Sequence, residues 1–181
     1  MIEENDRIYL REVLPEDWSA FHPYSSNEET VKHQPWGPNT EEDSLFFVRQ
    51  IIDRKQRHRS RYVFTIVEKQ LNQTIGNIEM NIRDWDGVGE IGLIIHHDYW
   101  GRGLATEAVQ LMLNYCFDPC ELQRMVATSN PENTGSVRVL VKVGMIKEGI
   151  LRKDLLVKGK GQNSCRFSML KEEWVKKSAR L

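Results

Sequence analysis

The segment that most constrains the fold is an apolar run that ends in a turn of small residues. Residues 90–96 (EIGLIIH) are typical of a buried strand, and WGRGLA follows at residues 100–105. Apolar residues then recur at helical spacing until Pro119. A strand that enters a helix through such a turn leaves the first backbone N–H groups of the helix unpaired, at the positive end of its dipole. The segment therefore predicts an anion-binding turn.

Length and charge restrict the class of protein. A chain of 181 residues favours a single domain over residues 1–181, and a net charge of −1 argues against nucleic-acid binding. No run of eighteen apolar residues occurs, and the N-terminal MIEENDR is acidic where a signal peptide is basic and then apolar. We therefore expect a cytoplasmic protein that binds neither membranes nor nucleic acids.

Cysteine usage argues against a metal centre. Cys116, Cys120 and Cys165 are odd in number and lack metal-ligand spacing with the histidines. We expect buried reduced thiols and no metal.

Periodicity and turn signals predict an α/β order of elements. Strands are expected over residues 7–13, 61–68, 74–82, 90–96 and 122–129, followed by a hairpin over 147–170. Helices are expected to begin at Pro15, to run from Thr40 to about His58, to follow the WGRGLA turn, and to run from Asn133 to Gly144.

Two common phosphate-binding motifs are missing from the turn. No GxxxxGK[ST] occurs, and Thr106 stands where a dinucleotide fingerprint has its third glycine. Gly101, Gly103 and Ala105 still let an extended pyrophosphate approach the backbone. A tight turn that binds no ligand is the alternative.

The same turn resembles the Q/RxxGxG/A pyrophosphate motif of the GNAT N-acetyltransferases, with Trp100 in place of Gln or Arg. RIYLREVLPEDW, EIGLIIHHDYWGRGLATEA and NPENTGSVRVLVKVGM resemble the RimJ/RimL branch of ribosomal-protein alanine N-acetyltransferases. The resemblance implies the GNAT fold, a mixed and strongly twisted sheet of six to seven strands with helices on both faces. Four residues match the family's NxxxxxxxxKxGF segment, with methionine replacing its phenylalanine: Asn133, Lys142, Gly144 and Met145.

The resemblance also implies that acetyl-CoA is the cosubstrate and lies between two splayed strands, residues 90–96 and 122–129. Free backbone groups there suit the pantetheine amides, and the N–H of Ile95 is expected to polarise the thioester carbonyl. The residues expected to bind the cofactor are Leu93, Ile94, Ile95, Trp100, Gly101, Arg102, Gly103, Leu104, Ala105, Thr106, Asn133, Ser136 and Lys142.

Acetyl transfer needs a base for the amine and a proton donor for the departing thiolate. Many GNAT enzymes have a tyrosine seven residues after the motif asparagine, where this chain has Leu140. Ser136 matches the serine of the NxxS segment in the RimJ/RimL branch, and the resemblance therefore makes it the expected donor or water relay, with a helix-capping role as its alternative. Glu90 opens the strand of the expected oxyanion donor, where several GNAT families have a glutamate, so the resemblance implies that it is the base, with cross-strand pairing as its alternative. Lesser candidates are Asp154, His96 and Glu79, and an amine that arrives neutral needs no base.

The acceptor is expected to be a primary amine, and the resemblance implies a protein N-terminal α-amine. A small amine (a polyamine, an amino acid or an aminoglycoside) is the alternative. A non-catalytic acyl-CoA-binding module is the competing class, motivated by the missing tyrosine. Trp36 and Trp85 are candidate walls of the acceptor pocket, although a core role is the more common one for tryptophan. A homodimer is a further candidate assembly.

Overall fold

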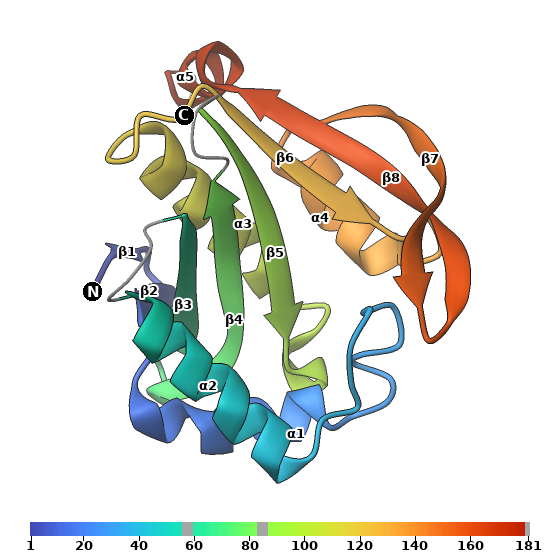
Figure 1. Cartoon of the computed structure of the whole chain (residues 1–181). Coiled ribbons are helices and arrows are strands. Elements are labelled where there is room, and N and C mark those ends of the chain that lie inside the picture. The colour runs from blue at the N-terminus through green and yellow to red at the C-terminus, as the bar shows by residue number, and fades with distance from the viewer. Residues whose placement is uncertain (56–59, 83–86, 180–181) are drawn as a thin grey trace.

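Eight strands form one open sheet in the order β1-β2-β3-β4-β5-β6-β8-β7 (Figure 1). The computed structural model describes residues 1–55, 60–82 and 87–179. The strands are β1 (Glu3–Glu4), β2 (Ile8–Glu12), β3 (Arg61–Glu68), β4 (Gln73–Ile82), β5 (Val88–Ile95), β6 (Arg124–Ser129), β7 (Ile146–Val157) and β8 (Lys160–Leu170).

The sheet is mixed, as expected, because β5 and β6 run parallel while the other neighbouring strands are antiparallel. It has eight strands rather than six or seven. The added strand is β1, whose Glu3 and Glu4 pair with Leu10 and Tyr9. Two residues are too few to show the alternation from which a strand can be predicted.

The described helices are the 3-10 turns η1 (Pro15–Asp17) and η2 (His97–Tyr99), and the α-helices α1 (Trp18–Ser25), α2 (Glu41–Lys55), α3 (Leu104–Phe117), α4 (Thr134–Lys142) and α5 (Lys171–Ser178). Thr40 caps α2, because its Oγ1 accepts the Asp43 N–H at 3.1 Å while the Asp43 carboxylate accepts the Thr40 N–H at 2.9 Å. The predicted end near His58 lies outside the described residues.

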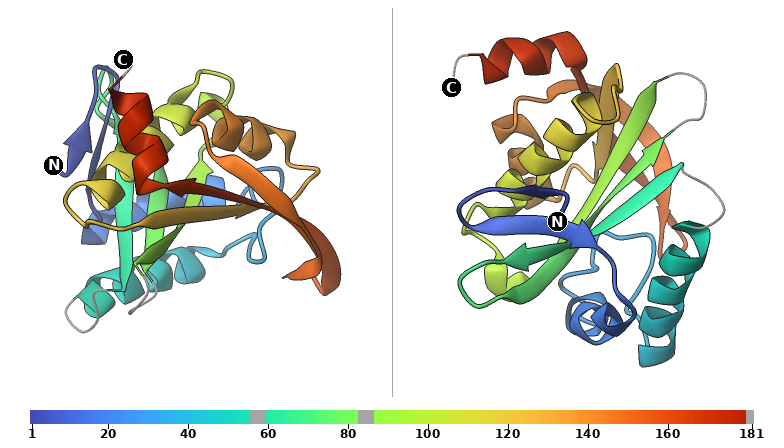
Figure 2. Two further views of the ribbon diagram at one scale, coloured as in Figure 1. Left: turned by 90° about the horizontal axis from the view of Figure 1, so that it is seen from above. Right: turned by 90° about the vertical axis from the view of Figure 1, so that its left-hand side faces the viewer.

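Helices cover both faces of the twisted sheet (Figure 2). The larger core lies between the sheet and α3, where Ile66, Ile78, Met112 and Phe117 are fully buried. A second core packs α1 and α2 against the opposite face and includes Ile94 of β5. Consecutive residues of β5 thus serve different cores, which fixes the register of the strand.

Asp17 joins α1 to the sheet as a buried carboxylate. It accepts hydrogen bonds from both terminal nitrogens of Arg11 at 2.6 and 2.7 Å, from the Leu14 N–H at 2.9 Å and from the Thr65 hydroxyl at 2.8 Å. Burial raises the pKa of Asp17, but these bonds outweigh it and hold the pKa below its ordinary value of 3.8. The group is therefore an ionised anchor between the start of α1 and β3.

Cysteine placement agrees largely with expectation. All three cysteines are free; Cys116 and Cys165 are buried, whereas Cys120 is half-buried. Among the described residues, no helix is long and apolar enough to cross a membrane.

Candidate active site

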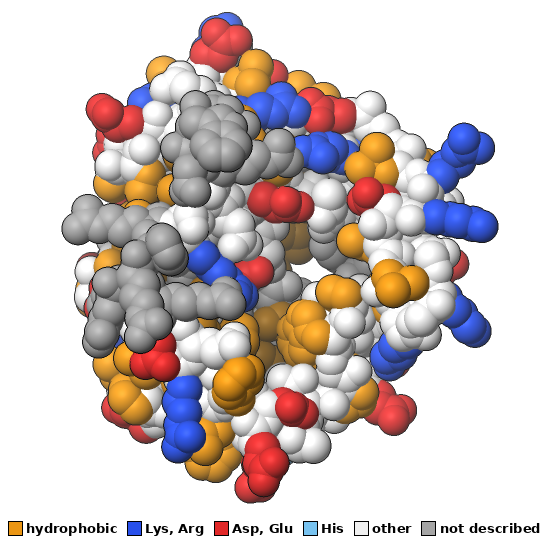
Figure 3. Space-filling view, viewed as in Figure 1, with side chains coloured by type: hydrophobic (Ala, Val, Ile, Leu, Met, Phe, Trp, Pro, Cys, Tyr) orange, Lys and Arg blue, Asp and Glu red, His pale blue; other side chains and the backbone are white. Residues whose placement is uncertain are grey.

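The parallel strands β5 and β6 pair over a short stretch and then part. Val88, Gly89 and Glu90 lie opposite Arg124, Met125 and Val126, and the pairing ends there although both strands continue. Figure 1 shows the two strands diverging beyond that point, and Figure 3 shows the surface hollowed in the same region. The sheet therefore contains the splayed gap that the family resemblance implies.

The pairing of β5 with β4 decides which backbone groups face this gap. The His96 N–H donates to the Ile75 carbonyl at 2.8 Å, and groups of alternate residues in an antiparallel pair point to the same neighbour. Leu93 and Ile95 therefore direct their backbone N–H and C=O groups away from β4 and toward the gap, where the Ile95 carbonyl accepts the Trp100 indole N–H. Ile94 directs its own backbone groups toward Asn77 of β4. Ile94 was expected to bind the cofactor, and this expectation is corrected. Its backbone groups face β4, and its side chain packs in the second core.

The turn before α3 has a backbone geometry that suits an anion. Gly101 and Gly103 have φ values of +75° and +82°, which favour glycine, and a Cβ at either position would meet nothing within 4 Å. Gly103 is the N-cap of α3 and has no side-chain capping bond. The first helical bond runs from the Glu107 N–H to the Gly103 carbonyl at 3.2 Å. The N–H groups of residues 104–106 therefore precede the helical ladder, where an anion can accept them.

Side chains around this turn hold it in place. The Trp100 indole N–H donates to the Ile95 carbonyl at 2.8 Å, and the Arg102 guanidinium lies 4.9 Å from the centre of the Tyr99 ring. Arg7 donates to the Arg102 carbonyl at 2.8 Å and pairs with Glu107 at 3.1 Å. Sequence analysis did not identify Arg7, because it lies 95 residues from Arg102 along the chain.

At the start of α4 the capping residue is Asn133 rather than Ser136. The Asn133 side-chain oxygen accepts the Ser136 N–H at 3.1 Å, so the capping alternative for Ser136 does not hold. The half-buried Ser136 hydroxyl has no hydrogen-bond partner among the described residues, which leaves it available to a ligand. Lys142 is exposed at the other end of the helix.

Glu90 lies at the point where β5 and β6 part. Its carboxylate accepts the Thr128 hydroxyl at 3.1 Å across the strands, and within the described part of the chain no arginine or lysine pairs with it. Both interpretations of Glu90 therefore have support, because it contacts a neighbouring strand and remains unneutralised beside the gap.

Glu79 and Asp154, two of the lesser candidate bases, are held by other groups. Arg61 donates to Glu79 at 2.5 and 3.1 Å, and the Ser164 hydroxyl donates to Asp154 at 2.6 Å. Glu79 packs over Gly92, where a Cβ would lie 3.0 Å from its Cγ.

Glu148 was not identified by sequence analysis. It faces two arginines, Arg124 and Arg166, on the face of the sheet that carries Glu90. It accepts from Arg124 at 2.5 Å and from the Ser168 hydroxyl at 2.9 Å, while Arg166 lies at 4.0 Å. The bonds from Arg124 and Ser168 lower the pKa of Glu148, so it is ionised at neutral pH.

Three potential metal ligands gather at the end of β5. One ligand atom each from His96, His97 and Asp98 lie within 4.8 Å of one another. The His96 Nδ1 already accepts the Asp98 N–H at 3.2 Å, so a metal ion at Nδ1 would displace that bond. Burial and the neighbouring His97 lower the pKa of His96. His96 is therefore neutral at pH 7 and engaged in the turn.

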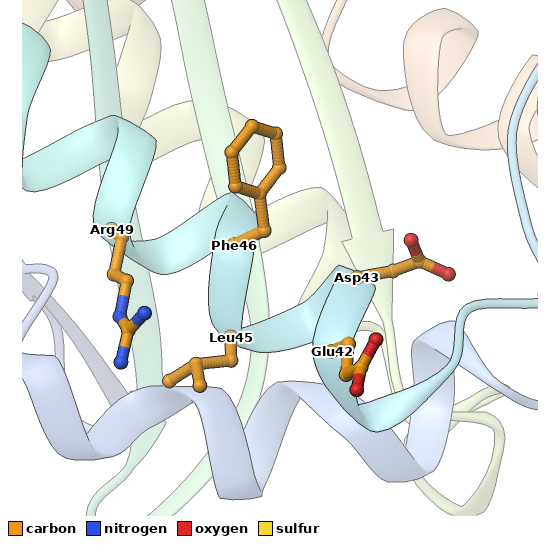
Figure 4. Close-up of a pocket in the computed structure, with 5 residues that line it drawn as sticks. All are labelled: Glu42, Asp43, Leu45, Phe46 and Arg49. Carbon is orange, nitrogen blue, oxygen red and sulfur yellow. The ribbon is translucent and has the colours of Figure 1, made fainter.

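The loop between α1 and α2, and α2 itself, carry exposed aromatic side chains. Trp36 lies in that loop and is 40 % exposed, so it does not fill the core. Phe46 of α2 is 61 % exposed and, with Glu42, Asp43, Leu45 and Arg49, lines a groove on the helix surface (Figure 4). Trp85 lies outside the described residues.

Splayed parallel strands, backbone groups open to the gap and an anion-binding turn together define an acyl-CoA-dependent transferase. The Acetyltransferase (GNAT) domain model matches residues 7–146. The chain therefore belongs to the GNAT family of N-acetyltransferases, which use acetyl-CoA.

Similar proteins extend over nearly the whole chain. The uncharacterized N-acetyltransferase YnaD of Bacillus subtilis is 32% identical over 168 residues, covering 93% of this chain and 96% of YnaD. A GNAT-family acetyltransferase structure from Bacillus anthracis is 31% identical, with a TM-score of 0.87 and coverage of 96% and 100%. The spermidine N(1)-acetyltransferase of Escherichia coli is 25% identical over 172 residues, covering 93% of this chain and 88% of that protein. These relatives do not single out the RimJ/RimL branch.

Proposed function

We propose that the protein transfers the acetyl group of acetyl-CoA directly to a primary amine, with Glu90 as the base. The observation that carries this proposal is the Glu90 carboxylate at the fork of β5 and β6, held by Thr128 and neutralised by no cation among the described residues. Glu79 is bound to Arg61, and His96 is engaged by the Asp98 N–H. Glu90 is therefore better placed to accept a proton than either of these.

Each group at the fork has a part in the reaction. The amine nitrogen attacks the thioester carbon, the C–N bond forms and the C–S bond breaks. The amine proton passes to Glu90, directly or through one water, and the departing thiolate takes a proton from the Ser136 hydroxyl or from water bound to it. The N–H of Ile95 faces the gap and stabilises the developing oxyanion, while the N–H groups that open α3 hold the pyrophosphate.

The charges on this face favour an acceptor with a single amine over a polyamine. Glu79 and Glu148 are already paired with arginines, so few carboxylates remain for a second or third ammonium group. The name of the Escherichia coli relative favours the polyamine instead. A protein N-terminal α-amine, as in the RimJ/RimL branch, and a small-molecule amine both fit a single-amine acceptor.

The proposal is tested by acetylation of an amine panel by the wild type and by Glu90→Gln. The panel contains peptides with N-terminal Ala or Ser, amino acids, aminoglycosides and spermidine. Because glutamine keeps the shape but accepts no proton, Glu90→Gln should lower kcat by about a hundredfold at pH 7. The deficit should shrink toward pH 9, where more amine is already neutral.

Asp154→Asn provides the comparison, since Asp154 is a second carboxylate on this face with a hydroxyl partner. Its turnover should stay within about twofold of the wild type. A large loss in Asp154→Asn with none in Glu90→Gln would transfer the role to Asp154. Acetyl-CoA binding without acetylation of any amine would refute the proposed reaction.

A further inference from the structure

Arg166 is a partly buried guanidinium with unused hydrogen-bond donors, on the face of the sheet that carries Thr128 and Glu90. Its side chain is 31% exposed, and within the part of the chain that the structure describes its one charged contact is Glu148 at 4.0 Å. That contact is too long for a hydrogen bond. Glu148 is itself held by Arg124 at 2.5 Å and by Ser168 at 2.9 Å. Among the described residues, the Glu148 carboxylate therefore lies near two arginines but accepts a hydrogen bond from Arg124 alone, and the Arg166 guanidinium has no hydrogen-bond acceptor.

Strand register places Arg166 on the same face of the sheet as the proposed base, with β6 between their two strands. Arg166 of β8 lies directly opposite Thr128 of β6, so the two side chains project from the same face of the sheet. The Thr128 hydroxyl in turn donates to Glu90 at 3.1 Å. A carboxylate that accepts protons and a guanidinium that binds anions thus flank one threonine.

The space next to Arg166 is open on its other side. Its partner on β7 is Gly149, and a Cβ on Gly149 would meet nothing within 4 Å. Gly149 therefore leaves a side-chain position vacant on the cross-strand neighbour of Arg166, on the side away from β6. A planar guanidinium with free donors is suited to a carboxylate, which it binds through two parallel hydrogen bonds.

We infer that the acceptor carries a carboxylate close to its amine, as an amino acid does, and that Arg166 binds that carboxylate while Glu90 receives the amine proton. This inference rests on the proposed function and narrows its substrate class. Arg166 then determines specificity rather than reactivity. Its removal should raise KM for a carboxylate-bearing acceptor and change kcat little.

The test compares acceptors that differ only in the carboxylate. The twenty L-amino acids, β-alanine and 4-aminobutyrate are each assayed beside the corresponding amide. A neighbouring carboxylate keeps an amine protonated, so chemistry alone favours the amide. A preference for the acid must therefore arise from binding. We expect kcat/KM at least tenfold higher for the acid at the optimal spacing, since hydrogen bonds to charged groups contribute this much or more.

Arg166→Gln should abolish this preference by losing activity on the acid and retaining it on the amide. Arg166→Lys should restore part of it, because the charge remains without the fork. Arg152→Gln is the matched control, since Arg152 is an exposed arginine of β7, in the same hairpin. It should behave as the wild type does. Circular dichroism and thermal unfolding establish that each variant is folded.

A second pair of variants tests the site without removing the arginine. Gly149→Glu places a carboxylate in the vacant position, where it should occupy Arg166 and abolish the acid preference. Gly149→Gln adds the same bulk without the charge and should retain more of that preference.

Failure of the inference is distinguishable from failure of the proposed function. If the wild type acetylates amides and cationic amines as well as acids, and Arg166→Gln leaves the ratio unchanged, the inference is overturned while the reaction stands. If no amine is acetylated, the proposed acetyl transfer is refuted. The carboxylate-binding site at Arg166 is then tested by calorimetric titration of the CoA-loaded protein with the amino acids. Binding that Arg166→Gln abolishes would support the subsite, and no binding to the wild type would overturn it.

Discussion

Substitution of Gly103 distinguishes between two interpretations of the turn before α3: a site that binds the cofactor, and a tight turn that binds no ligand. Gly103 has φ +82° at the start of α3, and a Cβ there would enter open space. A side chain at this φ costs about 1–2 kcal/mol of backbone strain. For a chain of this length, that cost lowers Tm by about 2–8 °C.

Gly159 supplies a matched control. It lies in the β7–β8 hairpin turn with φ +77°, and a Cβ there would also meet nothing within 4 Å. Gly103→Glu and Gly159→Glu should therefore lose similar stability. Only the first places a negative charge where the pyrophosphate is proposed to lie. Repulsion between the new glutamate carboxylate and two phosphate charges, each at about 4 Å in water, is about 2 kcal/mol in total. This corresponds to a roughly thirtyfold increase in the Kd for acetyl-CoA.

Isothermal titration calorimetry with acetyl-CoA measures the effect on affinity, and thermal unfolding measures the effect on stability. Gly103→Gln separates charge from bulk and should bind more tightly than Gly103→Glu. Equal affinities for Gly103→Glu and Gly159→Glu, in folded proteins, would show that the turn does not bind the pyrophosphate.

Three further predictions concern the proton donor, the support of the base and acid stability. Ser136→Ala should lower kcat about tenfold and leave the Kd for acetyl-CoA nearly unchanged, whereas unaltered turnover would remove Ser136 from the mechanism. Thr128→Val should reduce kcat about fivefold by freeing Glu90, and Thr128→Ser should restore it; equal rates for the two variants would contradict the role of the hydroxyl. Asp17→Asn should destabilise the fold by about 3 kcal/mol at pH 7, measured by urea unfolding. Because the folded-state pKa of Asp17 lies below its ordinary 3.8, this stabilisation is complete above that pH and is lost as the pH falls through the folded-state value; a cost that does not diminish as the pH is lowered below 3.8 would contradict the assignment.

Local signals explain how much of the fold could be predicted. Glycines at 101 and 103 predict the turn, and Thr40 predicts the start of α2. Each signal is contained within a few residues. Helix α5 was missed although Glu173 caps it through the Leu170 N–H at 2.9 Å and Lys176 and Lys177 lie in its last turn.

The candidate site depends on contacts between distant segments, which local patterns do not encode. Thr128 lies 38 residues from Glu90 along the chain, and their contact depends on where the parallel pairing ends. Arg166 lies opposite Thr128 only because β8 is inserted between β6 and β7. The family resemblance could propose Glu90 from its position on the strand, but neither Thr128 nor Arg166 could be identified as its neighbour from the sequence.

Because β5 and β6 pair over a short stretch, a cofactor bound between them is expected to stabilise the sheet. Three register positions at one end join the strands β1 to β5 to the strands β6 to β8. Acetyl-CoA bound along Leu93 and Ile95 would act as a missing strand that ties the two parts together. At a concentration one hundred times its Kd, such a ligand adds about 2.7 kcal/mol to the stability of the folded chain. Amide exchange along β5 and β6 should then slow on binding, so the protein's rigidity would vary with the cellular supply of its own cosubstrate.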